Sequence, residues 1–399
     1  MKNIRFALFA GAVGCALTTQ VPAAEAAKAA EAVLHSFGVA SDGVQPQANL
    51  FQMKGALYGT TAVGGLYAGG TVFAVTKTGQ ENVLYSFCSL KKCTDGGYPL
   101  AGVVDVNGML YGTTSAGGTN KAGSVFSLDP NSGSEQVLHA FGSGTDGAFP
   151  EAGLIAVNGT LYGTTQKGGA NGNGTVFSLD PGTGTEQVVY SFCSQLKCAD
   201  GQYPLASLTD VNGTLYGTTQ RGGSRGKGTV FTLDPSTGAE QAVYSFCTQQ
   251  KCADGEYPLA TLIDVNGMLY GTTFEGGADE YFGTVFALDP GTGAEQVLHS
   301  FCSKANCTDG AYPYAGLTEV NGLLYGTTGY GGASNGGSVF ALDPATGKQT
   351  VVYSFCGVTK CLDGDSPQAS LINVKGTLYG TTQAGGANNF GAVFGITNP

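Results

Sequence analysis

The tetrapeptide Tyr-Gly-Thr-Thr occurs seven times in this 399-residue chain, and its regular return is the strongest constraint on the fold. Successive copies lie 51 to 55 residues apart and begin at Tyr58, Tyr111, Tyr162, Tyr216, Tyr270, Tyr325 and Tyr379. Such a period indicates one structural unit that is built seven times. Residues present in every copy are therefore expected to be architectural, and functional groups are expected where a copy departs from the repeat.

Each unit contains four short runs with the composition of β-strands. In the fourth copy these runs, at 205–211, 215–219, 229–233 and 241–246, are rich in Val, Leu, Phe, Tyr and Thr. An Asn-Gly pair at 212–213 separates the first two runs, and this pair is the strongest short signal for a hairpin with a type I′ turn. Four antiparallel strands in about 50 residues are typical of a β-propeller blade.

The two ends of the repeat region are out of phase by one strand. The first run, 31–37, matches the fourth strand of the unit, whereas the last run, 391–397, matches the third strand. If 31–37 completes the last blade, the ring closes and the two ends of the chain are tied together. An open solenoid, the alternative, does not need this offset and is expected to show atypical capping repeats.

The sequence therefore predicts an all-β protein with a single domain at 27–399. We expect a seven-bladed β-propeller of four-stranded antiparallel blades, closed by the N-terminal strand. The predicted blades are 46–87, 99–141, 150–192, 204–246, 258–301, 313–355, and 367–397 together with 31–37.

Residues 1–26 have the pattern of a secretory signal peptide. Two basic residues precede an apolar stretch at 6–17, and small residues surround the expected cleavage point near 24–27. The stretch is too short to span a bilayer, and no other transmembrane segment is predicted. A lipid anchor at Cys15 is the alternative to simple cleavage, because Ala-Val-Gly-Cys resembles a lipoprotein box, although the usual Leu is missing. We expect export to the periplasm, the cell surface or the extracellular space.

Ten of the eleven cysteines form five pairs in the connection that follows the fourth strand. The pairs are Cys88/Cys93, Cys193/Cys198, Cys247/Cys252, Cys302/Cys307 and Cys356/Cys361. After Phe37 and Phe141 both cysteines are missing and the loop is three residues shorter. The two cysteines are therefore either both present or both absent in a given copy. This predicts a disulfide within each loop of an exported protein. A zinc site needs four converging ligands, and a thioredoxin-like redox motif has two intervening residues rather than four.

Several polar residues recur with the blades. The three histidines, at 35, 139 and 299, occupy a strand position that Tyr fills in the other copies, which favours a structural role. An Asp-Gly pair precedes each first strand, and the Asp is expected to make an Asx-type turn. A ring of calcium sites is the alternative, but calcium needs six to eight oxygens and each copy offers one carboxylate here.

Charge and motif content exclude several kinds of partner. The net charge is −11, the sequence pI is about 4.6 and 12% of residues are charged, which argues against nucleic acids and anionic membranes. The sequence has no phosphate-binding loop and no convincing set of nucleophile, base and orienting residue. We predict no catalytic residues, no metal, no cofactor and a monomeric protein.

The departures from the repeat point to one face of the ring. In a four-stranded meander, the loops after strands two and four share a face. The loop after strand two is basic in the fourth copy, with Arg221, Arg225 and Lys227, and reads Asp279, Glu280, Tyr281 and Phe282 in the fifth. Exposed aromatic and charged loop residues are a common way to present a binding face. The alternative is a solvated rim with an ion pair between blades.

The repeat units resemble the GloVer tandem repeat of "choice-of-anchor" exported bacterial proteins. The resemblance lies in Gly-Thr-Val-Phe-x-Leu-Asp-Pro, Val-Leu-Tyr-Ser-Phe, Asp-Gly-x-x-Pro and Asn-Gly-x-Leu-Tyr-Gly-Thr-Thr, and it covers nearly all of 29–399. It implies a surface or extracellular location and no particular reaction. Relatives can end in a C-terminal sorting anchor, whereas this sequence ends at Pro399 directly after its last strand.

The main functional hypothesis is an exported, non-enzymatic propeller that binds a protein or glycan or acts as a scaffold. One alternative is an enzyme acting on extracellular polysaccharide, with Asp279, Glu280 or Glu275 as acid or base. Glycosidase carboxyls must lie about 5 Å or roughly 6.5–9.5 Å apart, which neighbours in one loop do not establish. A purely structural envelope component is the third hypothesis.

Overall fold

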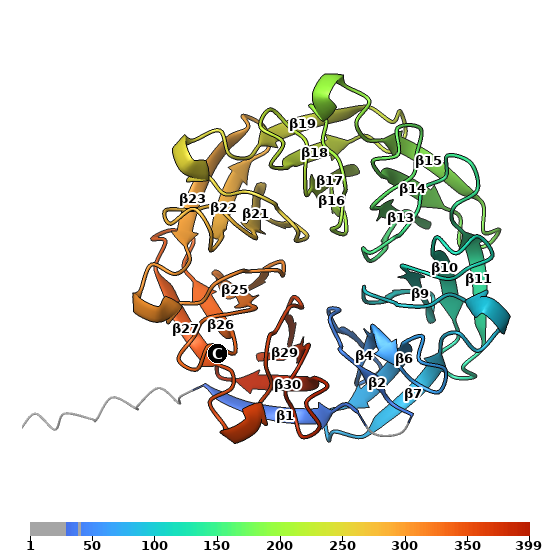
Figure 1. Cartoon of the computed structure of the whole chain (residues 1–399), viewed down its shortest axis with the longest axis horizontal. Helices are drawn as coiled ribbons and strands as arrows, with labels where there is room; N and C mark the ends of the chain where they lie inside the picture. The colour runs from blue at the N-terminus through green and yellow to red at the C-terminus, as the bar shows by residue number, and fades with distance from the viewer. Residues whose placement is uncertain (1–28, 39–40) are drawn as a thin grey trace, which may run out of the picture.

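Seven four-stranded antiparallel sheets surround a central channel in the computed structural model, which describes residues 29–38 and 41–399 (Figure 1). The first three blades are β3 (Phe51–Met53), β4 (Ala56–Thr61), β6 (Thr71–Thr76) and β7 (Glu81–Ser86); β8 (Val104–Val106), β9 (Met109–Thr114), β10 (Ser124–Leu128) and β11 (Glu135–Ala140); and β12 (Ile155–Val157), β13 (Thr160–Thr165), β14 (Thr175–Leu179) and β15 (Glu186–Ser191). The next three are β16 (Thr209–Val211), β17 (Thr214–Thr219), β18 (Thr229–Leu233) and β19 (Glu240–Ser245); β20 (Ile263–Val265), β21 (Met268–Thr273), β22 (Thr284–Asp289) and β23 (Ala294–Ser300); and β24 (Thr318–Val320), β25 (Leu323–Thr328), β26 (Ser338–Leu342) and β27 (Gln349–Ser354).

The last blade joins the two ends of the chain. It contains β28 (Ile372–Val374), β29 (Thr377–Thr382) and β30 (Ala392–Thr397), and its outer strand is β1 (Ala30–Ser36), which pairs antiparallel with β30. The predicted fold and its closure by the N-terminal strand are therefore confirmed. The predicted signal peptide and Cys15 lie outside the described residues.

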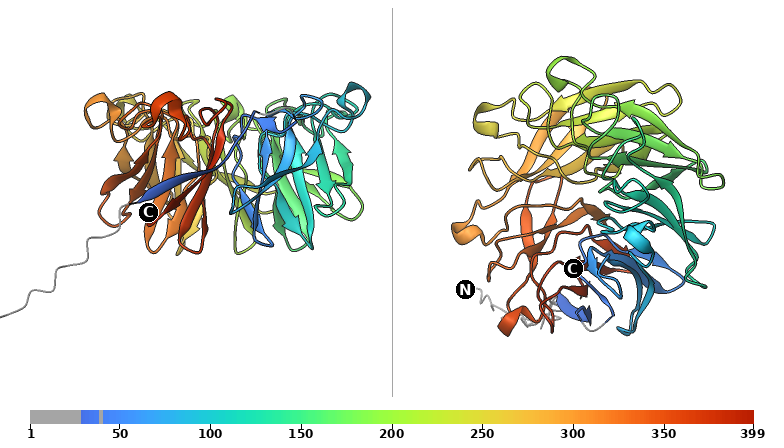
Figure 2. Two further views of the ribbon diagram at one scale, coloured as in Figure 1. Left: turned by 90° about the horizontal axis from the view of Figure 1, so that it is seen from below. Right: turned by 45° about the vertical axis from the view of Figure 1, so that its right-hand side comes forward.

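The two faces of the ring carry different connections (Figure 2, left). One face, called here the loop face, carries the loops between second and third strands and the connections between blades. It includes the short pair β2 (Gly43–Val44) and β5 (Val63–Gly64) and five 3₁₀ turns, η1 (Lys91–Cys93), η2 (Leu196–Cys198), η3 (Gln250–Cys252), η4 (Ala305–Cys307) and η5 (Thr359–Cys361). The opposite hairpin face carries the tight turns; Asn212 and Gly213 have φ of 54° and 87°, as a type I′ turn requires.

The first strand of each blade is shorter than predicted. In the fourth blade the expected run 205–211 yields only β16 (Thr209–Val211). Just before this run, Tyr203 bonds two blades: its backbone N–H donates to the carbonyl of Asn173 in the third blade, and its own carbonyl accepts the N–H of Gln220 in the fourth. Residues 205–207 then line the channel. The first strand is thus the innermost one, and its leading segment crosses the seam between blades.

The Gly of Tyr-Gly-Thr-Thr explains how neighbouring blades pack. A Cβ at any of the seven glycines would lie 2.5–2.7 Å from the ring of a third-strand Phe, such as Phe126 above Gly112, so only Gly fits. Each of these Phe rings is also met edge-on by a Phe of the preceding blade, with centroids 4.9–5.1 Å apart. These fully buried pairs form the centre of every seam.

The two threonines of the motif form hydrogen bonds that connect neighbouring blades and neighbouring strands. The hydroxyl of the first donates across the seam to an Ala carbonyl of the next blade at 2.8–3.2 Å in all seven copies, as Thr113 does to Ala152. The second is fully buried and bonds the start of the third strand, as between Thr114 and Ser124. The repeat residues are therefore architectural, because each one secures a contact between or within blades.

The repeated Asp has a different role from the one predicted. Asp95 does not start an Asx turn; its carboxylate accepts the backbone N–H of Ser89 at 2.8 Å and of Leu90 at 3.3 Å, six and five residues earlier. It also accepts the hydroxyl of Tyr85 at 3.0 Å. His139 replaces this Tyr in the second blade, with Nε2 3.0 Å from Asp146. The aspartates therefore anchor the connections between blades, and the histidines serve the same purpose as the tyrosines.

The ten paired cysteines lie together as predicted. In each of the five loops the two Cα atoms are 3.9–4.0 Å apart and the sulfurs are in bonding position. Each pair encloses a 3₁₀ turn that the Asp anchors at its base. The pairs therefore stiffen individual loops and do not connect blades.

Six seams also contain a half-buried glutamate of the outer strand. These residues, Glu31, Glu81, Glu135, Glu186, Glu240 and Glu295, face Asp363, Asp42, Asp95, Asp146, Asp200 and Asp254. Burial first, together with the neighbouring Asp charge, raises the pKa of each Glu to about 7. In the seventh seam Gln349 takes this position and donates to the carbonyl of Asp309 at 3.1 Å.

Removal of residues 28–37 should destabilise the protein strongly. The deletion takes away β1 and the fully buried Phe37, and loss of one such Phe side chain alone costs about 3–5 kcal/mol. Thermal unfolding is the measurement, with a chain starting at residue 29 as control and Phe37→Ala as a milder variant. Unchanged midpoints for both variants would contradict closure through β1.

Non-reducing peptide mapping of the folded protein should find five disulfides, each between cysteines five positions apart. The spacing within each loop leaves no partner in another blade. A bridge between blades, or a reactive thiol in the processed chain, would overturn the assignment.

The protein should unfold at higher temperature near pH 5 than near pH 8. A Glu whose folded pKa is raised to about 7 contributes stability below its unfolded value near 4.5 and loses it as the pH rises through 7. His35 and His299 act oppositely, because burial lowers their pKa, but they are two groups against six. Replacing all six glutamates with Gln, as in the seventh seam, should flatten the profile; a profile identical to wild type would refute this.

Candidate binding face

The channel mouth on the loop face is lined by equivalent residues of all seven blades. Its cavity has a volume of about 110 Å³, and the mouth positions are Gln47, Leu100, Glu151, Leu205, Leu259, Tyr314 and Gln368. Below them the backbones of neighbouring blades approach closely, because a Cβ on Gly102 would lie 2.5 Å from the carbonyl of Asn49 in the neighbouring blade. The side chains at the mouth therefore differ between blades while the backbone beneath them is fixed.

A ring of aromatic residues lies just outside the mouth, two positions earlier in the chain. They are Tyr98, Phe149, Tyr203, Tyr257 and Tyr312, each followed by Pro, and Gln45 and Ser366 take this position in the first and last blades. Each backbone N–H bonds a carbonyl of the preceding blade, and each C=O accepts a bond from its own blade. The residue therefore bridges the seam at the loop face.

Charged residues gather where the fourth blade meets the fifth. Lys227 forms an ion pair with the buried Glu256 and donates to the hydroxyl of Tyr257 at 2.7 Å. The guanidinium of Arg221 stacks 5.1 Å from the centre of the same ring. Burial and the charge of Glu256 raise the pKa of Glu275, which Lys227 and Arg221 partly offset. Two cations and two carboxyls thus surround one tyrosine.

Aromatic rings gather at the next seam. Phe274, directly after β21, lies 4.6 Å from Tyr314 and 5.1 Å from Tyr312 between ring centroids. Tyr330, in the loop between β25 and β26, meets Tyr312 edge-on at 6.0 Å and is 51% exposed. Since Tyr314 also lines the channel mouth, this aromatic cluster connects the mouth with the loop face.

The structure brings only some of the predicted binding residues together. Arg221 and Lys227 converge on Tyr257, whereas Glu280 pairs with Lys251 of the η3 turn at 2.5 Å. Tyr281 is 61% exposed, as expected for a loop tip. Arg225 and Asp279 are exposed in the same two loops.

Phe282 departs from its predicted role. It is half-buried, its ring lies 5.7 Å from Tyr312, and it packs against a core cluster that includes Val285. Its backbone carbonyl also accepts the N–H of Tyr312. The equivalent carbonyl accepts this bond in every blade, so Phe282 occupies a repeated backbone position, and its ring supports the aromatic cluster rather than standing free in solvent.

Sequence reasoning missed Phe274, Tyr312, Tyr314 and Glu256; of the acidic pair it singled out only Glu275. A comparison of the copies position by position could have found three of them. Gln occupies the place of Phe274 in three copies, and Leu occupies that of Tyr314 in three. Tyr312 itself is repeated, so the repeat concealed it. Its contact with Phe274 depends on packing between blades.

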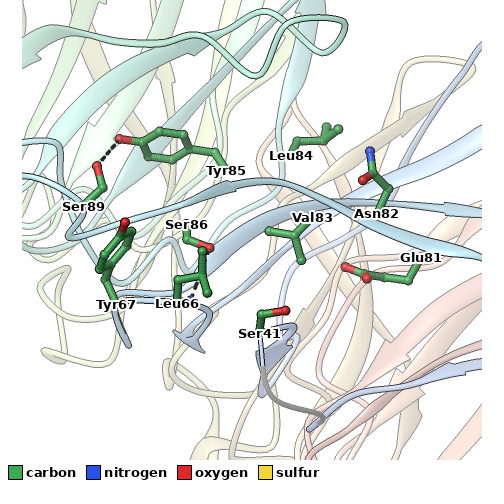
Figure 3. A pocket seen from close by; sticks show the side chains of 10 residues that line it. All are labelled: Ser41, Leu66, Tyr67, Glu81, Asn82, Val83, Leu84, Tyr85, Ser86 and Ser89. Carbon is green, nitrogen blue, oxygen red and sulfur yellow. Dashed lines mark hydrogen bonds between the residues drawn. The ribbon is translucent and has the colours of Figure 1, made fainter.

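A larger concavity of about 590 Å³ lies on the outside of the first blade (Figure 3). Glu81 to Ser86 of β7 form its floor, and the exposed Leu66 and Tyr67 stand beside it. Its lining offers one carboxyl, that of Glu81, which belongs to the repeated seam set. The concavity is large, but its lining offers no carboxyl beyond this repeated one. We therefore place the candidate site on the loop face.

Potential metal ligands converge once within the described residues. Cys247, Cys252 and Glu256 have ligand atoms within 4.8 Å of one another, but the two cysteines are paired with each other. The three histidines belong to the outer strands of three different blades. Over residues 29–38 and 41–399, the structure has no helix long and apolar enough to cross a membrane.

Comparison with known proteins identifies the repeat and the architecture. The family model described as the Gloeobacter/Verrucomicrobia repeat matches residues 22–177 and 156–394, so the resemblance noted in the sequence is confirmed. No curated protein matches the chain.

Solved propellers have the same general fold at low sequence identity. An oligogalacturonate lyase in complex with manganese is 11% identical, with a TM-score of 0.52 over 93% of this chain and 98% of the other. The oligogalacturonate lyase of Vibrio parahaemolyticus is 10% identical, with a TM-score of 0.51 over 90% of both chains. A chain of the nidogen/laminin complex is 16% identical, with a TM-score of 0.42 over 70% of this chain and 88% of the other. At such identities the two lyases show the fold alone.

Proposed function

The chain belongs to the Gloeobacter/Verrucomicrobia repeat family, and from that premise we propose that it is an exported, non-enzymatic binding or scaffold module. It acts at the cell envelope or outside the cell. It holds a protein or glycan ligand on the loop face where blades four, five and six meet beside the channel mouth.

One observation carries this proposal. Phe274, Tyr314 and Tyr330 stand where most other copies have Gln, Leu, Ala or another non-aromatic residue, and the three come together with Tyr312 on one seam. No repeated contact of the scaffold requires an aromatic ring at these three positions. Large, rigid aromatic side chains are enriched among the residues that dominate binding energy.

The neighbouring charges support recognition rather than strong electrostatic attraction. Lys227 and Glu256 neutralise each other, and Arg221 lies against Tyr257 near Glu275. These groups offer directed hydrogen bonds to a polar ligand with little net charge at the site. The overall charge of −11 also disfavours a strongly anionic partner.

Export is supported by two features of the chain. The first 26 residues have the pattern of a signal peptide, and five loops carry closely paired cysteines, which suit an oxidising compartment. Cys15 is the candidate lipid attachment point if the protein is anchored.

A polysaccharide-cleaving enzyme is the second candidate, and the raised pKa of Glu275 is the observation in its favour. Its neighbour Glu256 is paired with Lys227, and Glu280 is paired with Lys251, which leaves the exposed loop residue Asp279 as the remaining candidate for a second carboxyl. Product release from polysaccharides that is lost in Glu275→Gln would establish the enzyme and replace the binding module.

Reverting the aromatic cluster to the common repeat residues should remove binding. The triple variant Phe274→Gln, Tyr314→Leu, Tyr330→Ala should lose about 2 kcal/mol or more of binding free energy, roughly 30-fold in Kd, with its fold intact. The measurement is binding of oxidised protein to a glycan array and to purified cell-envelope material, followed by titration of the best ligand.

Lys348→Ala on the opposite hairpin face is the matched control and should bind like wild type. If the triple variant keeps full affinity, the ligand is not held at this seam. If wild-type protein binds neither the array nor envelope material, the purely structural role is favoured instead.

A further inference from the structure

We propose that the loop face is an extended platform for a neutral oligosaccharide, whose successive sugar rings stack on the aromatic residues of blades two to six. The oligosaccharide platform rests on the proposed function, because both place the ligand on the loop face. It adds the chemistry of the ligand and three residues that lie outside the aromatic cluster of Phe274, Tyr312, Tyr314 and Tyr330, namely Tyr98, Phe149 and Tyr203.

The first observation is that the aromatic residues share one backbone position. Five consecutive blades place Tyr or Phe there, directly before Pro, at the seam beside the channel mouth. Tyr98 is 46% exposed and Phe149 is 36% exposed. Tyr203, Tyr257 and Tyr312 are half-buried. Five aromatic side chains of differing exposure therefore follow one another around the face, which matches a polymer of repeated rings better than a compact ligand.

The second observation is that the backbone at this position is unfavourable for an aromatic residue. All five have φ between 56° and 59°, in the left-handed region that bulky side chains rarely adopt. Gln45 and Ser366 adopt the same conformation and make the same seam bonds, so the scaffold does not need a ring there. Such strain at bulky residues is characteristic of functional sites.

The third observation is that these rings are held in place before any ligand arrives. The backbone of each is bonded on both sides of its seam, and the Pro that follows restricts the backbone conformation of the aromatic residue before it. The ammonium of Lys167 lies 5.9 Å from the Phe149 ring centre, and Arg221 stacks on Tyr257. Ordering such side chains in advance lowers the entropic cost of binding.

Hydrogen-bonding groups accompany the rings. The backbone N–H of Gln166 bonds the carbonyl of Phe149, and that of Gln220 bonds the carbonyl of Tyr203, so each partly exposed amide side chain starts beside a ring. Sugars present one apolar ring face for stacking and hydroxyls at the edge for such amides. Aromatic side chains with a polar tip suit this mixed surface.

The charges favour a neutral sugar over an acidic one. Lys227 is neutralised by Glu256 and Lys251 by Glu280, and the net charge of −11 on the whole chain disfavours binding of polyuronates or sulfated polymers. A proline-rich peptide could also stack on aromatic rings. It would make little use of the amides between them, and we therefore assign the platform to saccharide.

The test uses neutral β-1,4-linked oligomers of glucose, xylose, mannose and N-acetylglucosamine, from dimer to hexamer, measured by calorimetry with the oxidised full-length protein. Oligogalacturonate and a polyproline peptide are the comparison probes. One neutral series should bind with affinity that increases beyond the trimer. The triple variant Tyr98→Asn, Phe149→Asn, Tyr203→Asn should weaken hexamer binding by about tenfold or more.

Asn adopts positive φ more readily than Tyr or Phe, so this variant should unfold at the same temperature as wild type or a higher one. Lys348→Ala again serves as the binding control. The double variant Tyr98→Asn, Phe149→Asn keeps the ring of Tyr203 and should recover part of the affinity that the triple variant loses. The single variant Tyr203→Phe keeps both the ring and the backbone conformation, so it should bind like wild type if stacking is the interaction that matters.

The outcomes distinguish the two proposals. If the variant Phe274→Gln, Tyr314→Leu, Tyr330→Ala loses binding but the triple Asn variant does not, the extended platform is wrong and the proposed site stands. If both variants bind like wild type, both are wrong. Binding of only oligogalacturonate or polyproline, or of no saccharide, overturns the neutral-oligosaccharide assignment.

Discussion

The whole ring depends on one steric fit, the Phe ring that occupies the space left by the missing side chain of Gly in Tyr-Gly-Thr-Thr. A Cβ at Gly217 would lie 2.5 Å from Phe231, and the same fit recurs in every blade. A second Phe from the preceding blade meets this ring edge-on, so the fit within a sheet also fixes the distance to its neighbour. Close-packed interiors tolerate few changes of volume, which explains why seven copies keep the same residues.

A scaffold secured in this way separates architecture from function. The seams use Gly, Phe, Thr, Asp and Tyr or His in nearly identical contacts, and few residues of the hairpin face depart from the repeat. The loop face differs, because many of its side chains project toward solvent from fixed backbone positions, although Phe282 packs against the core. Phe274 and Gln220 illustrate this freedom, since they occupy the same position in adjacent blades with opposite chemistry.

The half-buried glutamates of six seams destabilise the folded ring when they are ionised. A carboxyl at Glu240 faces Asp200 in a seam where neither oxygen of the Glu finds a hydrogen-bond partner within the described residues. Gln349 shows that an amide fills the same position and gains a hydrogen bond. Six seams therefore favour the protonated state, which couples the closure of the ring to pH.

The sequence was sufficient for the blade count, the closing strand and the pairing of cysteines, because each follows from periodicity or from residues lost together. It was insufficient where packing between blades decides. The carboxylate of Asp95 reaches backward to the preceding loop instead of forward, and Phe282 turns inward against Tyr312. The site was predicted in part: loop composition pointed to Arg221 and Lys227, but Tyr257, which both contact, looked like an ordinary repeat residue.

A crystal structure of the oxidised protein with its tightest-binding saccharide tests the central claim most directly, that the repeat builds a scaffold and the loop face carries the function. The account predicts sugar rings against the aromatic residues beside the channel mouth, with Tyr314 in contact and the blade seams unchanged. A ligand bound to the hairpin face, or in the concavity along β7, would contradict it.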